Sequence, residues 1–165
     1  MATTYEKIQS YTLGTAAATI DFTAIGSGYT DLRLVLVAID SAGGGVRMTY
    51  NSDTSSLYSN TQLYGAFSTA YSGRSTGIAY CDLSVLGLYS TAKLIEVDIF
   101  SYAGSTFKTN LVSFSGNTNG ASTDGIAKVV NLYRSTSAIT SIELKLDSGS
   151  FDAGTTATLY GILKA

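Results

Sequence analysis

The sequence predicts an all-β protein: an antiparallel β-sandwich of jelly-roll-like form with about eight main strands. Three observations predict this fold. Several segments alternate apolar and polar residues with a period of two, as strands with one buried face do. Apolar residues never recur at helical spacing over a useful length. Clusters of Gly, Ser, Asn and Asp interrupt the chain at strand-length intervals, which is typical of antiparallel sandwiches and barrels.

Two segments show the alternation most clearly. In residues 141–147, SIELKLD, and residues 93–100, KLIEVDIF, every second residue is apolar. The alternation predicts two inward faces, formed by Ile142, Leu144 and Leu146 and by Ile95, Val97 and Ile99. We expect the polar residues Lys93, Glu96 and Asp98 to face mostly outward.

Residues 32–39, LRLVLVAI, are apolar on both faces after Arg33. A strand covered on two sides, in the centre of a sandwich or at a subunit contact, has this composition. Turns are predicted in several segments, among them 51–56, 71–77 and 115–125, which are rich in Gly, Ser and Asn. The remaining strand candidates are 6–13, 19–23, 46–51, 62–67, 78–86, 107–114, 126–133 and 156–164.

The composition excludes several classes of function. We expect a single domain over residues 1–165. The chain has no His and one Cys, so Ser-His-Asp triads, His-ligated metals and intramolecular disulfides are excluded. The Lys and Arg residues are scattered, and no apolar stretch reaches membrane-spanning length, so no nucleic acid and no membrane partner is predicted. We expect synthesis in the cytoplasm without a standard signal peptide, and a packed, unreactive thiol at Cys81.

Three groups of residues were weighed as candidate chemical sites. Glu96 and Asp98 are about 7 Å apart on one strand face, near the spacing of glycosidase carboxylates, but on a face expected to be solvated. The loops 51–56 and 118–125 offer oxygen ligands for Ca²⁺ without matching a known calcium-loop spacing, so turn chemistry is favoured. We therefore predict no catalytic residues, no cofactor and no metal.

The tyrosines offer a candidate contact surface. Tyr58, Tyr64 and Tyr71 lie around a stretch predicted to be rich in loops. Exposed Tyr beside Asn and Ser makes an adaptable binding surface and can stack on sugars. The alternative is that Tyr occurs here because of its high β-propensity.

Four stretches give the chain a family resemblance. They are YEKIQSYTLGTAAATIDFTAIGSGYTDLRLVLVA (5–38), MTYNSDTSSLYSNTQLYG (48–65), FSYAGSTFKTNLVSFSGNTNG (100–120) and NLYRSTSAITSIELKLDSGSFDAGTTATLYGILKA (131–165). The chain resembles a group of small β-sandwich structural proteins of tailed bacteriophages, of the type found in phages of aquatic and cyanobacterial hosts. Two positions depart from the family pattern: Ser52 stands where Gly is usual, and Tyr133 where Trp is common. The shared motifs mark turns and strand ends, and none resembles a catalytic signature.

The resemblance implies a virion component, not an enzyme, that acts as a capsid decoration (cement) protein. Such proteins are commonly homotrimers that bind and stabilise the lattice of the major capsid protein at the capsid surface. The alternative is a tail, neck or head-fibre module whose loops bind a host surface glycan. A cellular carbohydrate-binding module is a third, more distant possibility. The candidate partner-contact residues are Asn51, Asp53, Tyr58, Tyr64, Tyr71 and Arg74.

Overall fold

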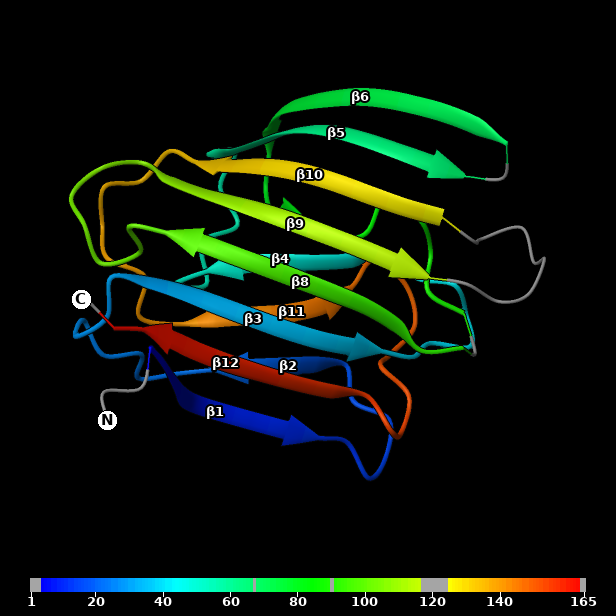
Figure 1. Ribbon diagram of the computed structural model, residues 1–165, viewed down its shortest axis with the longest axis horizontal. Coiled ribbons are helices and arrows are strands. Elements are labelled where there is room, and N and C mark those ends of the chain that lie inside the picture. Colours follow the sequence, from blue (N-terminus) through cyan, green and yellow to red (C-terminus); the bar gives the residue numbers. More distant parts are fainter. Residues whose placement is uncertain (1–3, 67, 90, 117–124, 164–165) are drawn as a thin grey trace.

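The protein is an antiparallel β-sandwich, as predicted (Figure 1). A computed structural model describes residues 4–66, 68–89, 91–116 and 125–163, and this part of the chain contains twelve strands and no helix. Accordingly, none of the described residues belongs to a helix long and apolar enough to cross a membrane. The strands are β1 (Tyr5–Thr12), β2 (Thr19–Phe22), β3 (Asp31–Ala38), β4 (Val46–Tyr50), β5 (Tyr58–Ala66), β6 (Thr69–Ile78), β7 (Cys81–Asp82), β8 (Lys93–Phe100), β9 (Lys108–Gly116), β10 (Gly125–Tyr133), β11 (Ile142–Leu146) and β12 (Thr156–Ile162).

The two sheets differ in size. The larger has eight strands in the order β1-β12-β3-β8-β9-β10-β5-β6, and the smaller has four in the order β2-β11-β4-β7. All of the pairings are antiparallel. In Figure 1 the larger sheet lies toward the viewer, and its outer face carries no second layer of structure. The smaller sheet covers part of its inner face.

The core lies between the sheets and is built by the predicted alternation. Ile95, Val97 and Ile99 of β8 are fully buried, and Ile142, Leu144 and Leu146 of β11 are buried opposite them. Both inward faces predicted from the sequence are therefore confirmed. Removing these side chains from water supplies the main driving force for folding.

One prediction about side-chain direction is wrong, and another is met only in part. Lys93 is fully buried, because it shares the parity of Ile95 and Val97 and so lies on the inner face of β8. Within one chain, strand β3 is covered on one side only: Leu32, Leu34 and the other even-numbered residues are buried, whereas the odd-numbered ones are half-buried. Its second apolar face belongs to the uncovered outer surface of the larger sheet. The centre of the sandwich therefore does not account for this second apolar face, and the subunit contact stays a prediction.

The predicted turn at 71–77 is also wrong, since these residues lie within β6, the longest strand of the described chain. Their Gly and Ser residues read as turn formers, but pairing with β5 imposes an extended backbone. The predicted strand at 78–86 shrinks to β7, a pair of residues at the edge of the smaller sheet. β6 forms an edge of the larger sheet, at the top of Figure 1.

Candidate assembly surface

Asn51 and Asp53 hold the turn after β4. Asn51 and Ser52 both have positive φ, 53° and 56°, and Asp53 N donates to Tyr50 O over 2.9 Å, which is the geometry of a type I′ turn. The Asn51 amide is fully engaged with the segment 138–141: Nδ2 donates to Ala138 O at 2.8 Å, and Oδ1 accepts from backbone N–H groups. Asn51 therefore joins two loops of the protein.

Tyr58 and Asp53 stabilise the same turn after β4. The Tyr58 ring is buried and stacks on Tyr133 with centroids 4.6 Å apart, while its hydroxyl donates to Asp53 O. The Asp53 carboxylate accepts hydrogen bonds from Ser55 and Tyr133, and these bonds hold its pKa below the usual value. The loop 51–56, considered above as a calcium loop, thus uses its carboxylate internally.

Tyr64 and Tyr71 form a second aromatic pair at the far end of the β5–β6 hairpin. They lie directly opposite each other in the ladder and stack with ring centroids 5.0 Å apart. Tyr64 has the parity of buried Tyr58 and packs against the core, and Tyr71 is 43% exposed. The pair lies on the inner side of the larger sheet, beyond the part that β7 covers.

Arg74 lies on the opposite side of this hairpin. It pairs with Thr61, whose parity places both residues on the outer face of the larger sheet. The six predicted contact residues therefore do not converge. Asn51, Asp53 and Tyr58 stabilise the turn after β4, and Arg74 faces outward. Tyr64 and Tyr71 lie on the inner side of the β5–β6 hairpin, which we call the inner ledge.

Cys81, which the sequence predicts to be a packed thiol, is buried in a network of polar side chains between the sheets. Asn110 Nδ2 donates to the Tyr50 hydroxyl at 2.7 Å and to Cys81 Sγ at 3.2 Å, and Asn131 Nδ2 donates to Asn110 Oδ1 at 3.0 Å. Asn131 also exchanges two hydrogen bonds with the backbone of Asp82. Cys81 is fully buried, so the predicted packing of the thiol is confirmed, and burial raises its pKa to about 12. A thiol with a raised pKa is expected to be unreactive.

Tyr102 and Lys108, in the stretch 100–120 that carries part of the family resemblance, also have structural roles. The buried Tyr102 hydroxyl donates to Gly26 O at 2.5 Å, and Lys108 Nζ donates to Gly104 O and Thr106 O. Burial lowers the pKa of Lys108. This spacing of Tyr and Lys closes the loop between β8 and β9 and ties it to the segment before β3.

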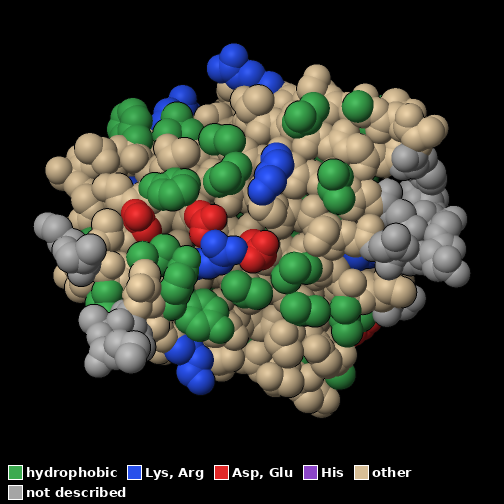
Figure 2. Space-filling view, in the orientation of Figure 1, with side chains coloured by type: hydrophobic (Ala, Val, Ile, Leu, Met, Phe, Trp, Pro, Cys, Tyr) green, Lys and Arg blue, Asp and Glu red, His purple; other side chains and the backbone are tan. Residues whose placement is uncertain are grey.

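The outer face of the larger sheet is the most distinctive surface. Large apolar side chains stand on it uncovered, from the three strands β5, β8 and β10. Ile126 is 69% exposed and Leu63 is 61% exposed. Figure 2 views this face and shows hydrophobic side chains spread around a central group of acidic and basic ones. The exposed apolar residues on this face include Leu63, Leu94, Phe100, Ile126 and Val130. Exposed apolar residues gathered on one face mark contact surfaces.

The register of three strands hollows this face into a groove. Gly65 of β5 lies opposite Ala70 of β6 on one side and Ile126 of β10 on the other. The small residues form a floor between Leu63 and Ile126, and the open groove measures about 460 Å³, with Lys128 at its margin. A Cβ added to Gly65 would meet no atom within 4 Å. The groove has room for an apolar side chain from a partner.

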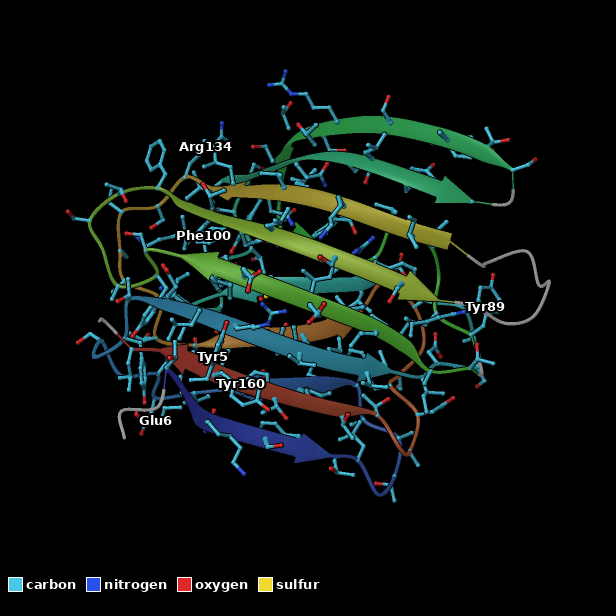
Figure 3. The ribbon with its side chains drawn as sticks, viewed as in Figure 1. Tyr5, Glu6, Tyr89, Phe100, Arg134 and Tyr160 are labelled. Atoms are coloured by element: carbon cyan, nitrogen blue, oxygen red, sulfur yellow. The ribbon has the colours of Figure 1, made fainter. Side chains whose placement is uncertain are left out.

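The central charges of this face are held by one arginine. Arg33 Nη2 lies 2.5 Å from Glu96 Oε1, and its Nη1 lies 3.1 Å from Asp98 Oδ1. The carboxylate pair weighed above as a glycosidase candidate is thus joined by a cation in a half-buried ion triad. At one end of the same face, Tyr160 of β12 lies near Tyr5 of β1, with Phe100 at the end of β8 (Figure 3).

Sequence reasoning missed the groove, although a signal was present. Ile126, Lys128 and Val130 share one parity in β10, and the lysine identifies that parity as the outward one. Two apolar residues on the face of a charged one indicate a contact surface. The signal was obscured because both faces of this strand carry apolar residues, so only Lys128 distinguishes the outward one.

The described residues contain no group of three His, Cys, Asp or Glu side chains that could hold a metal ion. The second calcium-loop candidate, 118–125, lies outside the described residues except for Gly125. No family model matches the chain, and no curated protein matches its sequence.

Proposed function

We propose that this protein is a bacteriophage capsid decoration protein that binds the lattice of the major capsid protein through the outer face of its larger sheet. The observation that carries the proposal is the uncovered groove between Leu63 and Ile126 on that face. Leaving such side chains in water costs about 25 cal/mol per Å² of apolar surface, so covering them favours association. The choice of the major capsid protein as the partner rests on the family resemblance of the sequence.

The surface has the composition of a protein–protein contact. Its apolar side chains come from β5, β8 and β10 and surround the Arg33 ion triad. An apolar patch with a small charged group supplies burial, and the charges fix the orientation of the partner. A lattice with many equivalent sites would be covered by many copies of the chain.

Binding of this kind stabilises a capsid by mass action. A ligand that binds the expanded lattice and not its separated subunits lowers the free energy of the assembled state. The Arg33–Glu96–Asp98 triad and the groove both lie on paired strands of the larger sheet, so docking requires little additional ordering of the backbone. The proposed homotrimer would present three such faces, and avidity would strengthen attachment.

Copy number tests the proposal. Quantitative mass spectrometry of purified virions should find this chain at hundreds of copies, comparable with the number of capsid lattice positions. A count that matches a single tail or neck ring would contradict a decoration role. Light scattering of the purified protein tests the trimer separately.

A second candidate is a tail or head-fibre module that binds a host surface glycan. The observation that favours it is the stacked pair Tyr64 and Tyr71, with Tyr71 43% exposed on the inner ledge, because aromatic rings exposed in this way can stack on sugars. On a glycan array or host cells, Tyr71→Ala should then abolish binding. Tyr89→Ala is the matched control, since Tyr89 is 41% exposed and lies elsewhere. Equal binding by both variants would rule out the ledge.

A further inference from the structure

Strand β6 presents an open backbone edge. It is the end strand of the larger sheet and has β5 as its only partner in the ladder. From Thr69 to Thr76 it pairs with β5 without a register shift. Among the described residues, no backbone hydrogen bond outside the strand ladders involves Thr69–Ile78. Its outward N–H and C=O groups therefore face solvent.

The other three sheet edges are protected. β2 and β7, the edges of the smaller sheet, have four and two residues. β1 is interrupted by a register shift between Lys7 and Gln9, and it exposes Glu6 and Lys7. Short edge strands, bulges and charges are the means by which proteins prevent unwanted strand pairing. β6 has ten residues, one charge and no proline.

We propose that β6 is a strand-addition site and that its occupant is β6 of a second copy of this chain, joined antiparallel about a two-fold axis. The two larger sheets would then form one continuous sheet across the dimer. The main-chain groups of both edges would find hydrogen-bond partners, and neither copy would have to change conformation.

The sequence of β6 is self-complementary when the axis passes at Ser72. In that register Arg74 of each copy lies opposite Ala70 of the other, so no like charges meet across the interface. Tyr71 of each copy lies opposite Gly73 of the other, so no second large side chain meets the ring directly across the interface, although Gln62 of β5 packs over Gly73. An axis at Arg74 would instead place the two guanidinium groups opposite each other.

The ledge formed by the hairpin supports the same occupant. Tyr71 stacks on Tyr64 on the inner side of β5 and β6, where the smaller sheet provides no cover. A second copy joined at β6 would bring its own tyrosine pair to this side. The aromatic rings would then be shielded by the partner's residues, and burial of aromatic surface would add to the main-chain hydrogen bonds.

This contact uses the backbone edge of β6, whereas the proposed capsid contact uses the outer face of the sheet, and the two adjoin at Ala70. It is also distinct from the proposed homotrimer. A two-fold contact at β6 produces species with an even number of chains: dimers if it acts alone, and hexamers if a trimer contact is also present. Its failure and the failure of the proposed function are therefore distinguishable in solution, without any capsid.

Sedimentation velocity of the full chain over a wide concentration range tests the pairing. The wild type should show an even-numbered species, and Ser72→Lys should raise its dissociation constant by about tenfold or more, because two lysines would meet at the axis. Thr12→Lys adds the same charge to the β1 edge and should leave association unchanged. The thermal unfolding of both variants, followed by circular dichroism, checks that each is folded.

A cross-linking experiment tests the register. Ser72→Cys should form a disulfide-linked dimer when diamide oxidises the two thiols, whereas Thr12→Cys should give no disulfide-linked dimer on a non-reducing gel. The native Cys81 is fully buried and should not react. The inference is overturned if the wild type forms no even-numbered species, or if Ser72→Lys associates as strongly as Thr12→Lys.

Discussion

The Tyr133 hydroxyl donates a hydrogen bond to Asp53 Oδ2 over 2.7 Å and so ties the end of β10 to the turn after β4. Asp53 also accepts from the backbone and side chain of Ser55, and these donors together hold the pKa of its carboxyl below 3.8. The bond joins two stretches of the chain that are far apart in sequence. It makes the turn part of the sandwich.

Tyr133→Phe should lower the free energy of unfolding by about 0.5–1.5 kcal/mol near neutral pH, because it removes one hydrogen bond to a charged group and keeps the ring stack. A carboxyl with a lowered folded pKa contributes stability above its unfolded pKa, and this is lost as the pH falls through the folded value. The difference in free energy of unfolding between Tyr133→Phe and the wild type should therefore shrink below pH about 4. Denaturant unfolding across this range measures it.

Tyr160→Phe is the control for that variant, since no hydrogen bond of the Tyr160 hydroxyl is present among the described residues. It should unfold like the wild type. Equal destabilisation by both variants, or a Tyr133→Phe loss that does not change with pH, would contradict the role given to Asp53.

Asp82 should respond to pH in the opposite direction. Burial raises its pKa to about 6, although the Ser84 backbone N–H and Arg47 partly offset this. A carboxyl with a raised folded pKa contributes stability below its unfolded value, and this contribution is lost as the pH rises from about 4 to about 6. At pH about 7.5, the free energy of unfolding of Asp82→Asn should therefore exceed that of the wild type by about 1–2 kcal/mol, after allowance for partial exposure of the side chain. The variant should accordingly unfold at a higher temperature.

At pH about 3, below the pKa of about 3.9 that Asp82 has in the unfolded chain, the two proteins should converge, because Asp82 is then mostly protonated in both states. Glu143→Gln removes a negative charge from the half-buried outer side of β11, together with a 3.9 Å ion pair to Lys145, and serves as the control for net charge. A partly exposed pair of this kind contributes little to stability. A gain by Glu143→Gln as large as that of Asp82→Asn would show that overall charge, and not burial at Asp82, is responsible.

Ser52→Gly should stabilise the protein. Ser52 has φ of 56° in the type I′ turn, a conformation that costs a residue with a Cβ about 1–2 kcal/mol. Glycine avoids this cost but loses more chain entropy on folding, so the net gain should be about 0.5–1 kcal/mol. Chemical denaturation should show it, and Ser56→Gly is the matched control because Ser56 lies in the same loop without a positive φ. A loss of stability in Ser52→Gly would contradict the turn assignment.

The sequence predicted the sandwich wherever alternation was strict. Ile142, Leu144 and Leu146 are alternate residues of β11, so all three point to the same face of the strand. That face is buried between the two sheets. Lys93 was assigned to the wrong face because its chemistry was weighed above its parity, although it is two residues from Ile95. The parity of a strand decides the direction of a side chain, and a local charge does not.

The candidate site was harder to predict because it depends on pairing between strands. The residues 71–77 contain the Gly and Ser of a turn, and nothing local shows that β5 will pair with them. The groove needs Gly65, Ala70 and Ile126 in adjacent strands, and only the register brings them together. Tyr58 was read as a displayed ring, but its stacking on Tyr133 is a contact that sequence spacing does not reveal.

Binding to expanded capsids stripped of this protein tests the central claim most directly. The wild type should bind saturably, and Gly65→Leu, which fills the groove without a clash at its Cβ, should weaken binding by about tenfold or more. Ile126→Lys should have the same effect, whereas Phe107→Lys, at a 53% exposed position before β9, should bind like the wild type. Absence of wild-type binding, or equal binding by all three variants, would contradict the claim that this face binds the capsid lattice.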